Sequence, residues 1–240
     1  MRKKRVAKAK KEPIPDKQLL SDGNRRKHIL KLYKKAKSLL ENSECEKALE
    51  HSNQILSIDA KNLGGLHMKG FALYGLGRLD ESVACFQKAT EIKPDSDTAW
   101  FCIGGALEDK GQLEEALKHY KKAVRLNPQN GLNHGKLGAL LAKLGKHEEA
   151  VQYYTSATRI NPNNASYWAN LSQSLGLLGR FEEALTACNK SLEIAPEHEQ
   201  CLKNKKVILD RMKAQKGKTT KMKGKKAKKL TGEKQKLLNP

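Results

Sequence analysis

The chain has few of the features that mark secreted or membrane proteins. Its 240 residues include five cysteines, an odd number with no Cys-x-x-Cys pair. Such a set argues against a disulfide framework and favours a reducing, intracellular compartment. The basic N-terminus is not followed by an apolar run of about seven residues, and no stretch approaches about eighteen consecutive apolar residues. We therefore expect a soluble, cytoplasmic protein without a secretory signal or transmembrane segment, with a nuclear location open if the host is eukaryotic.

The sequence also lacks the motifs of catalysis and of cofactor or metal binding. The stretch Gly217-Lys218-Thr219 has Met212 where a phosphate-binding loop requires glycine. The seven histidines include no His-Glu-x-x-His motif and no cysteine partner at ligand spacing. We therefore expect no enzymatic activity, no cofactor and no metal site.

The positive charge is concentrated at the two ends of the chain. The 47 Lys and Arg residues exceed the 26 Asp and Glu residues by a formal net charge of +21. Residues 1–28 hold 11 basic and 3 acidic residues, and residues 211–240 hold 12 and 1, so residues 29–210 are nearly balanced. Lysine-rich segments with few apolar residues cannot bury enough surface to fold alone. We predict a basic flexible N-terminal segment at 1–28 and a lysine-rich disordered tail at 214–240.

A motif with a spacing of 34 residues fills the middle of the chain. The stretch "GQLEEALKHYKKAVRLNP" at 111–128 is followed by "GKHEEAVQYYTSATRINP" at 145–162 and "GRFEEALTACNKSLEIAP" at 179–196. Pro94 precedes the first of these prolines by the same spacing, and one more step back reaches Ala60. This spacing defines five units, at 29–62, 63–96, 97–130, 131–164 and 165–198.

Each unit carries two apolar stripes with helical spacing. The first passes through a large fourth residue, a small eighth residue and an eleventh residue that is leucine in all five units. The second passes through a small twentieth residue, the twenty-fourth and the twenty-seventh, and each stripe lies on one face of an α-helix. A glycine separates the stripes in four units, while proline ends the second stripe and Asp, Asn or Ser beyond it can cap the next helix. Each unit is thus predicted to be two antiparallel helices in close contact at the eighth and twentieth residues. Ala150 is the twentieth residue of the fourth unit and should lie at such a contact.

This 34-residue pattern resembles that of the tetratricopeptide repeat proteins. The resemblance covers residues 29–198, and "TAWFCIGGALEDKGQLEEALKHYKKAVRLNP" in the third unit satisfies nearly every signature position. The first unit departs most, with Ala60 in place of the proline and Ser52 in place of the aromatic residue. The resemblance implies an all-α fold, a right-handed α-solenoid of stacked antiparallel helix pairs. It also implies one additional capping helix at 199–213.

The resemblance further implies a concave groove lined by the second, fifth, ninth and twelfth residues of each unit. In this family the groove holds a peptide or helix of a protein partner. Here these positions are mostly small, apolar or aromatic, and exposed apolar side chains often mark interaction sites. Packing by neighbouring helices or by the tails is the alternative use of these side chains. The residues predicted for the partner groove are His67, Phe71, Tyr74, Phe101, Glu108, Asn170 and Gln173.

One subclass of the family is unlike this chain. Its co-chaperone members hold the acidic tails of heat-shock chaperones with a carboxylate clamp of Lys, Asn and Arg residues. No three consecutive units here supply these residues at the clamp positions, so we do not expect chaperone-tail binding.

The lysine clusters form a separate candidate site. Lys and Arg attract polyanions by releasing counterions, without reading a sequence, and no aromatic residues are interleaved for base stacking. Contact with nucleic acid or the ribosome, a nuclear import signal, an acidic membrane surface and solubility alone remain alternatives. The predicted polyanion contacts are Lys3, Lys4, Arg5, Lys221, Lys223, Lys225, Lys226, Lys228 and Lys229.

The two candidate sites lead to two functional hypotheses. The first is a non-enzymatic scaffold or adaptor that binds a peptide or helix of a partner in its groove while the basic tails contact polyanions. The alternative is a nucleic-acid-associated or ribosome-associated factor in which the lysine-rich tails carry the main function.

Overall fold

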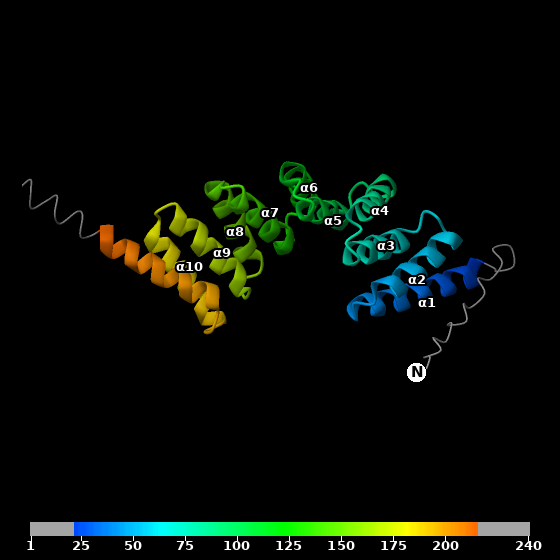
Figure 1. Cartoon of the computed structure of the whole chain (residues 1–240), viewed down its shortest axis with the longest axis horizontal. Helices are drawn as coiled ribbons and strands as arrows, with labels where there is room; N and C mark the ends of the chain where they lie inside the picture. The colour runs from blue at the N-terminus through cyan, green and yellow to red at the C-terminus, as the bar shows by residue number, and fades with distance from the viewer. Residues whose placement is uncertain (1–21, 216–240) are drawn as a thin grey trace, which may run out of the picture. The chain divides into compact units, whose positions relative to one another are not determined.

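The computed structural model describes residues 22–215, and nearly all of these residues are helical (Figure 1). No β-strand occurs in this range. A further helix, named here the C-terminal helix, covers residues 199–215. The preceding helices are α1 (Asp22–Glu41), α2 (Cys45–Ile58), α3 (Leu63–Gly75), α4 (Leu79–Ile92), α5 (Asp97–Asp109), α6 (Leu113–Leu126), α7 (Gly131–Lys143), α8 (His147–Ile160), α9 (Ala165–Leu177) and α10 (Phe181–Ile194).

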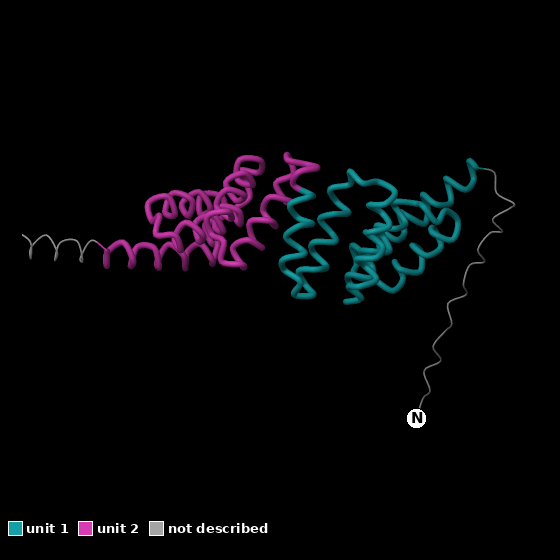
Figure 2. The backbone as a smooth tube through the Cα atoms, turned by 90° about the horizontal axis from the view of Figure 1, so that it is seen from above, with its two compact units in different colours: residues 1–123 teal, residues 124–240 magenta. Residues whose placement is uncertain are grey.

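The chain divides into two compact units, residues 1–123 and 124–240 (Figure 2). In unit 1, α2 packs against α1 and α3, and α4 packs against α3 and α5. In unit 2, α8 packs against α7 and α9, and α10 packs against α9. Short turns make sequential helices antiparallel. The predicted all-α fold of stacked helix pairs is therefore confirmed.

Polar caps begin the first helix of each later pair. The side chain of Asn62 accepts a hydrogen bond from the amide of Gly65 at 2.9 Å, and the hydroxyl of Ser96 accepts one from Ala99 at 3.3 Å. Asn130 and Asn164 act in the same way at the starts of α7 and α9. These bonds satisfy amides that have no partner inside the helix. The residues after the prolines predicted the caps at Ser96, Asn130 and Asn164, whereas Asn62 follows Ala60.

Small and aromatic residues fit together inside the three middle helix pairs. A Cβ atom added at Gly70 would lie 2.6 Å from Phe86 Cζ, and one added at Gly104 would lie 2.8 Å from Tyr120 Cδ1. Distances this short leave no room for a methyl group. Ala150, at the twentieth position of its repeat, is fully buried. The predicted close approach at the eighth and twentieth residues is therefore present.

The large fourth residues do more than fill space. Trp100 Nε1 donates a hydrogen bond to the carbonyl of Pro94 at 2.9 Å, and Trp168 Nε1 donates one to Pro162 at 2.8 Å. Both indoles are only half-buried. Each indole therefore tethers its helix to the turn before it, a role that the spacing alone did not predict.

The first helix is longer than the charge pattern suggested. α1 begins at Asp22, so residues 22–28, which we had assigned to the flexible basic segment, are helical. Lys and Arg are good helix formers, and Leu32 and Ala36 anchor one face of α1 in the core while most of its charged residues stay exposed. The C-terminal helix likewise continues to residue 215 instead of 213. The predicted polyanion contacts of both tails lie outside the described residues.

Candidate partner-binding surface

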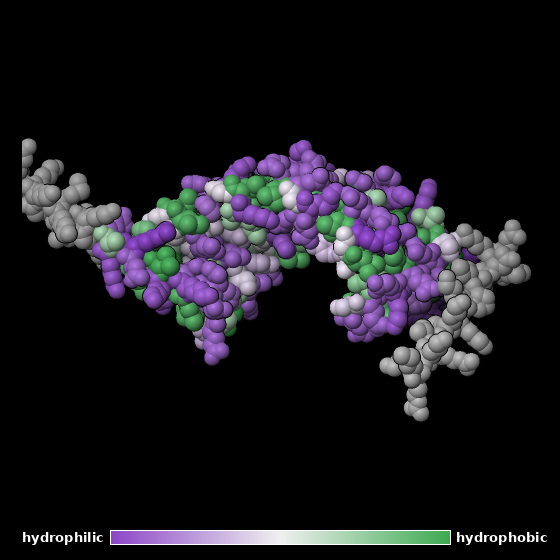
Figure 3. Space-filling model, in the orientation of Figure 1, coloured by the Kyte–Doolittle hydropathy of each residue, from purple (hydrophilic) through white to green (hydrophobic). Residues whose placement is uncertain are grey.

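Five of the predicted groove residues lie on α3 and α5 of unit 1. His67, Phe71 and Phe101 are half-buried, and Tyr74 is 39% exposed. Glu108 lies near the end of α5 and is half-buried. The space-filling view shows hydrophobic residues gathered over α3 on the visible face (Figure 3). Together with Asp109, the residues Phe71, Tyr74, Phe101 and Glu108 are called the α3–α5 surface below.

The aromatic side chains of this surface rest on aromatic side chains of the interior. The ring of Phe71 meets Phe86 edge-on, with centroids 5.3 Å apart. Phe101 lies 5.4 Å from Tyr120 in a tilted arrangement. Phe86 and Tyr120 are almost fully buried, so they are fixed by the helix packing. The outer rings therefore have a rigid support, and such aromatic pairs add stability beyond their buried area.

Two carboxylates lie beside these rings, each held by a tyrosine. The hydroxyl of Tyr74 donates a hydrogen bond to Asp109, and that of Tyr120 donates one to Glu108 Oε2 at 3.0 Å. The hydrogen bond to Asp109, helped by burial, raises the pKa of Tyr74 to about 12. Tyr74 therefore stays protonated at neutral pH and joins α3 to the end of α5.

Asp109 and Tyr120 were missing from the predicted site. The prediction used the second, fifth, ninth and twelfth positions of each repeat, and Asp109 is at the thirteenth, next to Glu108. Tyr120 belongs to the interior stripe of its repeat, yet its hydroxyl reaches the carboxylate of Glu108. The one feature of the sequence that could have pointed to Asp109 is its place directly after Glu108, in an acidic pair at the end of α5.

His67 lies between the interior and the surface. Its ring is 6.0 Å from that of Phe86, and its Nε2 atom is buried with no hydrogen-bond partner among the described residues. Burial, together with the positive charge of Lys93, lowers the pKa of His67. The side chain is therefore neutral at pH 7 and acts as an apolar contact.

The groove positions of unit 2 differ from those of unit 1. Gly135 and Ala169, at fifth positions, are buried, and a Cβ atom at Gly135 would lie 2.5 Å from Tyr167 Cε1. These two positions are helix contacts and not surface, which corrects the predicted pattern. Asn170 is half-buried and Gln173 is exposed, both on α9. They belong to unit 2, so the structure does not join them to the α3–α5 surface.

Gln173 lines a pocket between α9 and the C-terminal helix. The pocket has a volume of about 150 Å³. Leu177 from α9 and Val207, Ile208 and Arg211 from the C-terminal helix also line it. Spacing arguments confined to the repeats could not find it, because half of its lining comes from the helix after the last repeat.

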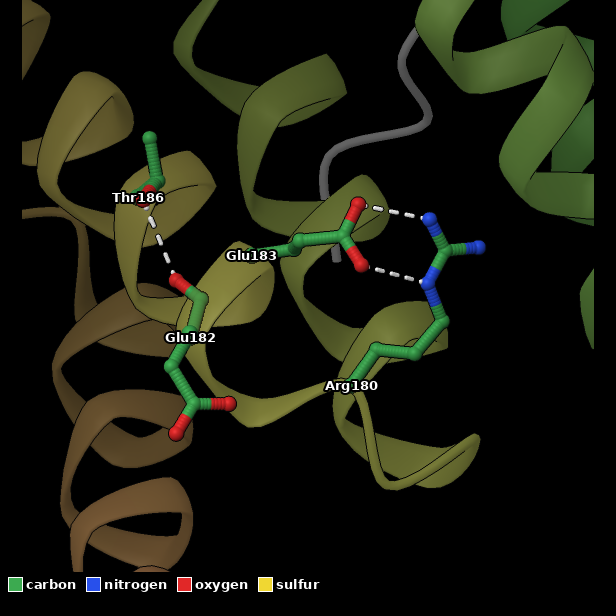
Figure 4. Close-up of polar contacts among 4 residues, drawn as sticks. All are labelled: Arg180, Glu182, Glu183 and Thr186. Atoms are coloured by element: carbon green, nitrogen blue, oxygen red, sulfur yellow. Dashed lines mark hydrogen bonds and ion pairs between the residues drawn. The ribbon is translucent and has the colours of Figure 1, made fainter.

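The recurring glutamate pairs have structural roles. Arg180 forms a two-point ion pair with Glu183, with N–O distances of 2.7 and 2.6 Å (Figure 4). The backbone carbonyl of Glu182 accepts a hydrogen bond from the hydroxyl of Thr186 at 3.0 Å. Both ends of the ion pair are exposed, where such pairs contribute little to stability. Glu182 and Glu183 lie in the first turn of α10, where negative charge interacts favourably with the positive end of the helix dipole.

Other chemical sites do not emerge from residues 22–215. No three His, Cys, Asp or Glu residues in this range are placed to hold a metal ion. All five cysteines are free, and burial raises the pKa of Cys102 to about 12, which keeps its thiol unreactive. None of the helices in this range is long and apolar enough to span a bilayer.

Comparison with known structures supports the fold. The crystal structure of YrrB, described as a TPR protein with an unusual peptide-binding site, is 24% identical, with a TM-score of 0.60 over 73% of this chain and 90% of that one. MamA from Desulfovibrio magneticus RS-1 is 19% identical, with a TM-score of 0.62 over 72% of this chain and 97% of that one. At these identities the likeness shows the fold alone. No curated protein matches the chain in sequence.

Family models described as tetratricopeptide repeats match three overlapping parts of the sequence. They cover residues 67–131, 107–175 and 165–198, which together span more than half of the chain. The helix pairs, their glycine turns and their caps agree with this assignment. Repeats of this kind serve as scaffolds for protein–protein interaction. The chain belongs to the tetratricopeptide repeat family.

Proposed function

We propose that the chain is a scaffold that binds an apolar peptide or helix of a protein partner on the α3–α5 surface. The observation that carries this proposal is the set of partly exposed rings of Phe71, Tyr74 and Phe101, two of which rest on buried aromatic residues. Rings fixed in advance lose little conformational entropy when a ligand covers them. Aromatic residues also dominate the binding free energy at protein interfaces.

The carboxylates indicate which apolar segment would bind best. Glu108 and Asp109 lie at the edge of the aromatic surface, each already in contact with a tyrosine hydroxyl. A carboxylate accepts more than one hydrogen bond, and the side chain of Asp109 is exposed, so Asp109 can receive a further donor. A Lys or Arg on the partner would meet this carboxylate and also the faces of the rings. The preferred ligand is therefore an apolar segment that carries a basic residue.

The fold is compatible with such a role. YrrB has a peptide-binding site according to its description, and it shares this fold. The likeness does not transfer its ligand, because the two sequences are only 24% identical. The support for this chain comes from its own aromatic residues.

The test is selection of peptides followed by matched substitutions. Peptides would be selected from a random display library against the full chain, and their affinities measured by fluorescence anisotropy. The double variant Tyr74→Ala/Phe101→Ala should weaken binding roughly tenfold or more, since truncating such residues often costs over 1 kcal/mol each. Ile92→Ala is the control, because Ile92 is also on unit 1 and is 40% exposed. Equal losses in both variants, or no loss in the double variant, would count against the proposal.

A second function rests on the charge of the two ends. Residues 1–28 hold 11 basic and 3 acidic residues, and residues 211–240 hold 12 basic and 1 acidic residue; this positive charge favours contact with nucleic acid or the ribosome. Removing residues 1–21 and 216–240 should abolish RNA retention and leave binding of the selected peptides unchanged. Capture of a protein partner that disappears after nuclease treatment would instead make the tails the main functional element.

A further inference from the structure

The pocket of unit 2 is built by two helices that contribute different side chains. The C-terminal helix supplies Asn204, Val207, Ile208 and Arg211, whose spacing of three and four residues places them on one face. α9 supplies small residues, Ser172 and Gly176, with Gln173 and Leu177 beside them. In Figure 1 the C-terminal helix follows α10 and lies beside this part of unit 2.

The pocket lies where the side of α9 that faces the C-terminal helix carries the small residues Ser172 and Gly176. A Cβ atom at Gly176 would already lie 3.4 Å from Ile208 Cγ1, so the two helices are close at this point. Ile208 is 3% exposed and forms the floor, whereas Leu177 and Val207 are each 50% exposed and form apolar walls. A cavity of about 150 Å³ is large enough for a group the size of benzene. It therefore fits one aliphatic side chain.

The rim of the pocket offers hydrogen-bond donors and one positive charge. Arg211 Nη1 lies 3.5 Å from the carbonyl of Gly176, and Asn204 Nδ2 lies 3.4 Å from that of Ala169. Both distances are at the long limit for a hydrogen bond, so these donors are held only weakly. Of the residues that line the pocket, Arg211 is the one that carries a charge. The rim is therefore complementary to a carboxylate, which guanidinium groups bind with two parallel hydrogen bonds.

We propose that this pocket is a second binding site, specific for a protein segment in which an aliphatic residue is next to a glutamate. The aliphatic side chain enters between Leu177 and Val207 above Ile208, and the glutamate carboxylate pairs with Arg211. Asn204 and Gln173 hold the backbone of the segment at the rim. The inference rests on the proposed function in that the ligand belongs to a protein partner, but it concerns a different site with the opposite charge preference from the α3–α5 surface.

The probe is the peptide acetyl-Gly-Leu-Glu-Gly-amide, titrated into the full chain and followed by nuclear magnetic resonance. The side-chain N–H signals of Gln173, Asn204 and Arg211 report on the pocket directly. We expect these signals to shift and saturate. Alanine in place of the peptide's leucine should remove the saturable shift, and glutamine in place of its glutamate should weaken binding about two- to fivefold, the range of a partly exposed ion pair.

Two substitutions on the same helix separate the pocket from the rest of the surface. Val207→Asp places a negative charge on the pocket wall and should abolish binding of the peptide. Leu209→Asp is the matched control, since Leu209 is 39% exposed but does not line the pocket, and it should bind like the natural sequence. Arg211→Gln should remove the preference for glutamate over glutamine and keep the preference for leucine over alanine.

Three results would overturn the inference: no saturable shift, equal affinity for the glutamate and glutamine peptides, or the same loss in Leu209→Asp as in Val207→Asp. Circular dichroism establishes that each variant keeps its helix content. The double variant Tyr74→Ala/Phe101→Ala should leave this titration unchanged. If the pocket does not bind the probe peptide while the α3–α5 surface still binds its selected peptides, only this inference is wrong and the proposed function stands.

Discussion

Units 1 and 2 have the same interior and different surfaces. Inside unit 1, a Cβ atom at Gly70 would lie 2.6 Å from Phe86, and inside unit 2, one at Gly138 would lie 3.0 Å from Tyr154. Outside, unit 1 shows aromatic rings beside two carboxylates, whereas unit 2 shows an aliphatic pocket beside Arg211. The interior positions recur because every helix pair must meet the same packing constraint. The surface positions are free of that constraint, so we expect the two units to differ there in what they bind.

This contrast separates residues that hold the fold from residues that select a partner. Substitutions at recurring interior positions should lower the free energy of unfolding, and those at the surface positions should change binding with little effect on stability. This distinction is wrong if a substitution at a surface position lowers the free energy of unfolding as much as one at an interior position.

The largest effect is expected at the aromatic residue inside a helix pair. Phe86 is 1% exposed, and Phe86→Ala should lower the free energy of unfolding by about 3–5 kcal/mol, because it leaves a cavity beside Gly70. Phe71→Ala, which removes a half-buried ring from the surface, should cost clearly less. Urea denaturation followed by circular dichroism measures both. Similar costs for the two variants would show that Phe71 belongs to the core and not to a binding surface.

A smaller effect is expected at the close approach of α7 and α8. Ala150 is fully buried, and Ala150→Leu should lower the free energy of unfolding by ~1–3 kcal/mol because the larger side chain overpacks the contact. Gln152→Leu adds the same side chain to an exposed position of the same helix. The control should change stability by no more than about 0.5 kcal/mol. An unchanged melting temperature for Ala150→Leu would contradict the packing described here.

The sequence predicted the interior better than the surface. The spacing of small and leucine residues identified the helix pairs, and the residues after the prolines identified the caps at Ser96, Asn130 and Asn164, because these features repeat in nearly every unit. The length of α1 was not predicted, since charged residues can lie on an exposed helical face as readily as in a tail.

The candidate sites were predicted only in part, for a physical reason. Phe71 and Tyr74 were predicted because the family resemblance implies a groove at the ninth and twelfth positions, and the structure leaves both rings partly exposed. Asp109 was missed, since its role depends on the reach of the Tyr74 hydroxyl across two helices. The pocket around Arg211 was missed because it depends on how the C-terminal helix lies against α9, which no repeat in the sequence encodes.

The smallest effect is expected at the turns, where the first helix pair of unit 1 differs from all later pairs. Gly145 in unit 2 has a φ angle of 74°, and the corresponding residue of the first pair is Ser43, with a φ angle of 60°. A residue with a Cβ atom is strained in this left-handed region by roughly 1–2 kcal/mol, so Gly145→Ala should cost about 1 kcal/mol. Ser43→Gly relieves the same strain but gives the unfolded chain more freedom, so it should gain only a few tenths of a kcal/mol. Thermal denaturation of the two variants measures the difference, and a loss of stability in Ser43→Gly would mean that the serine side chain stabilises its turn in a way that glycine cannot replace.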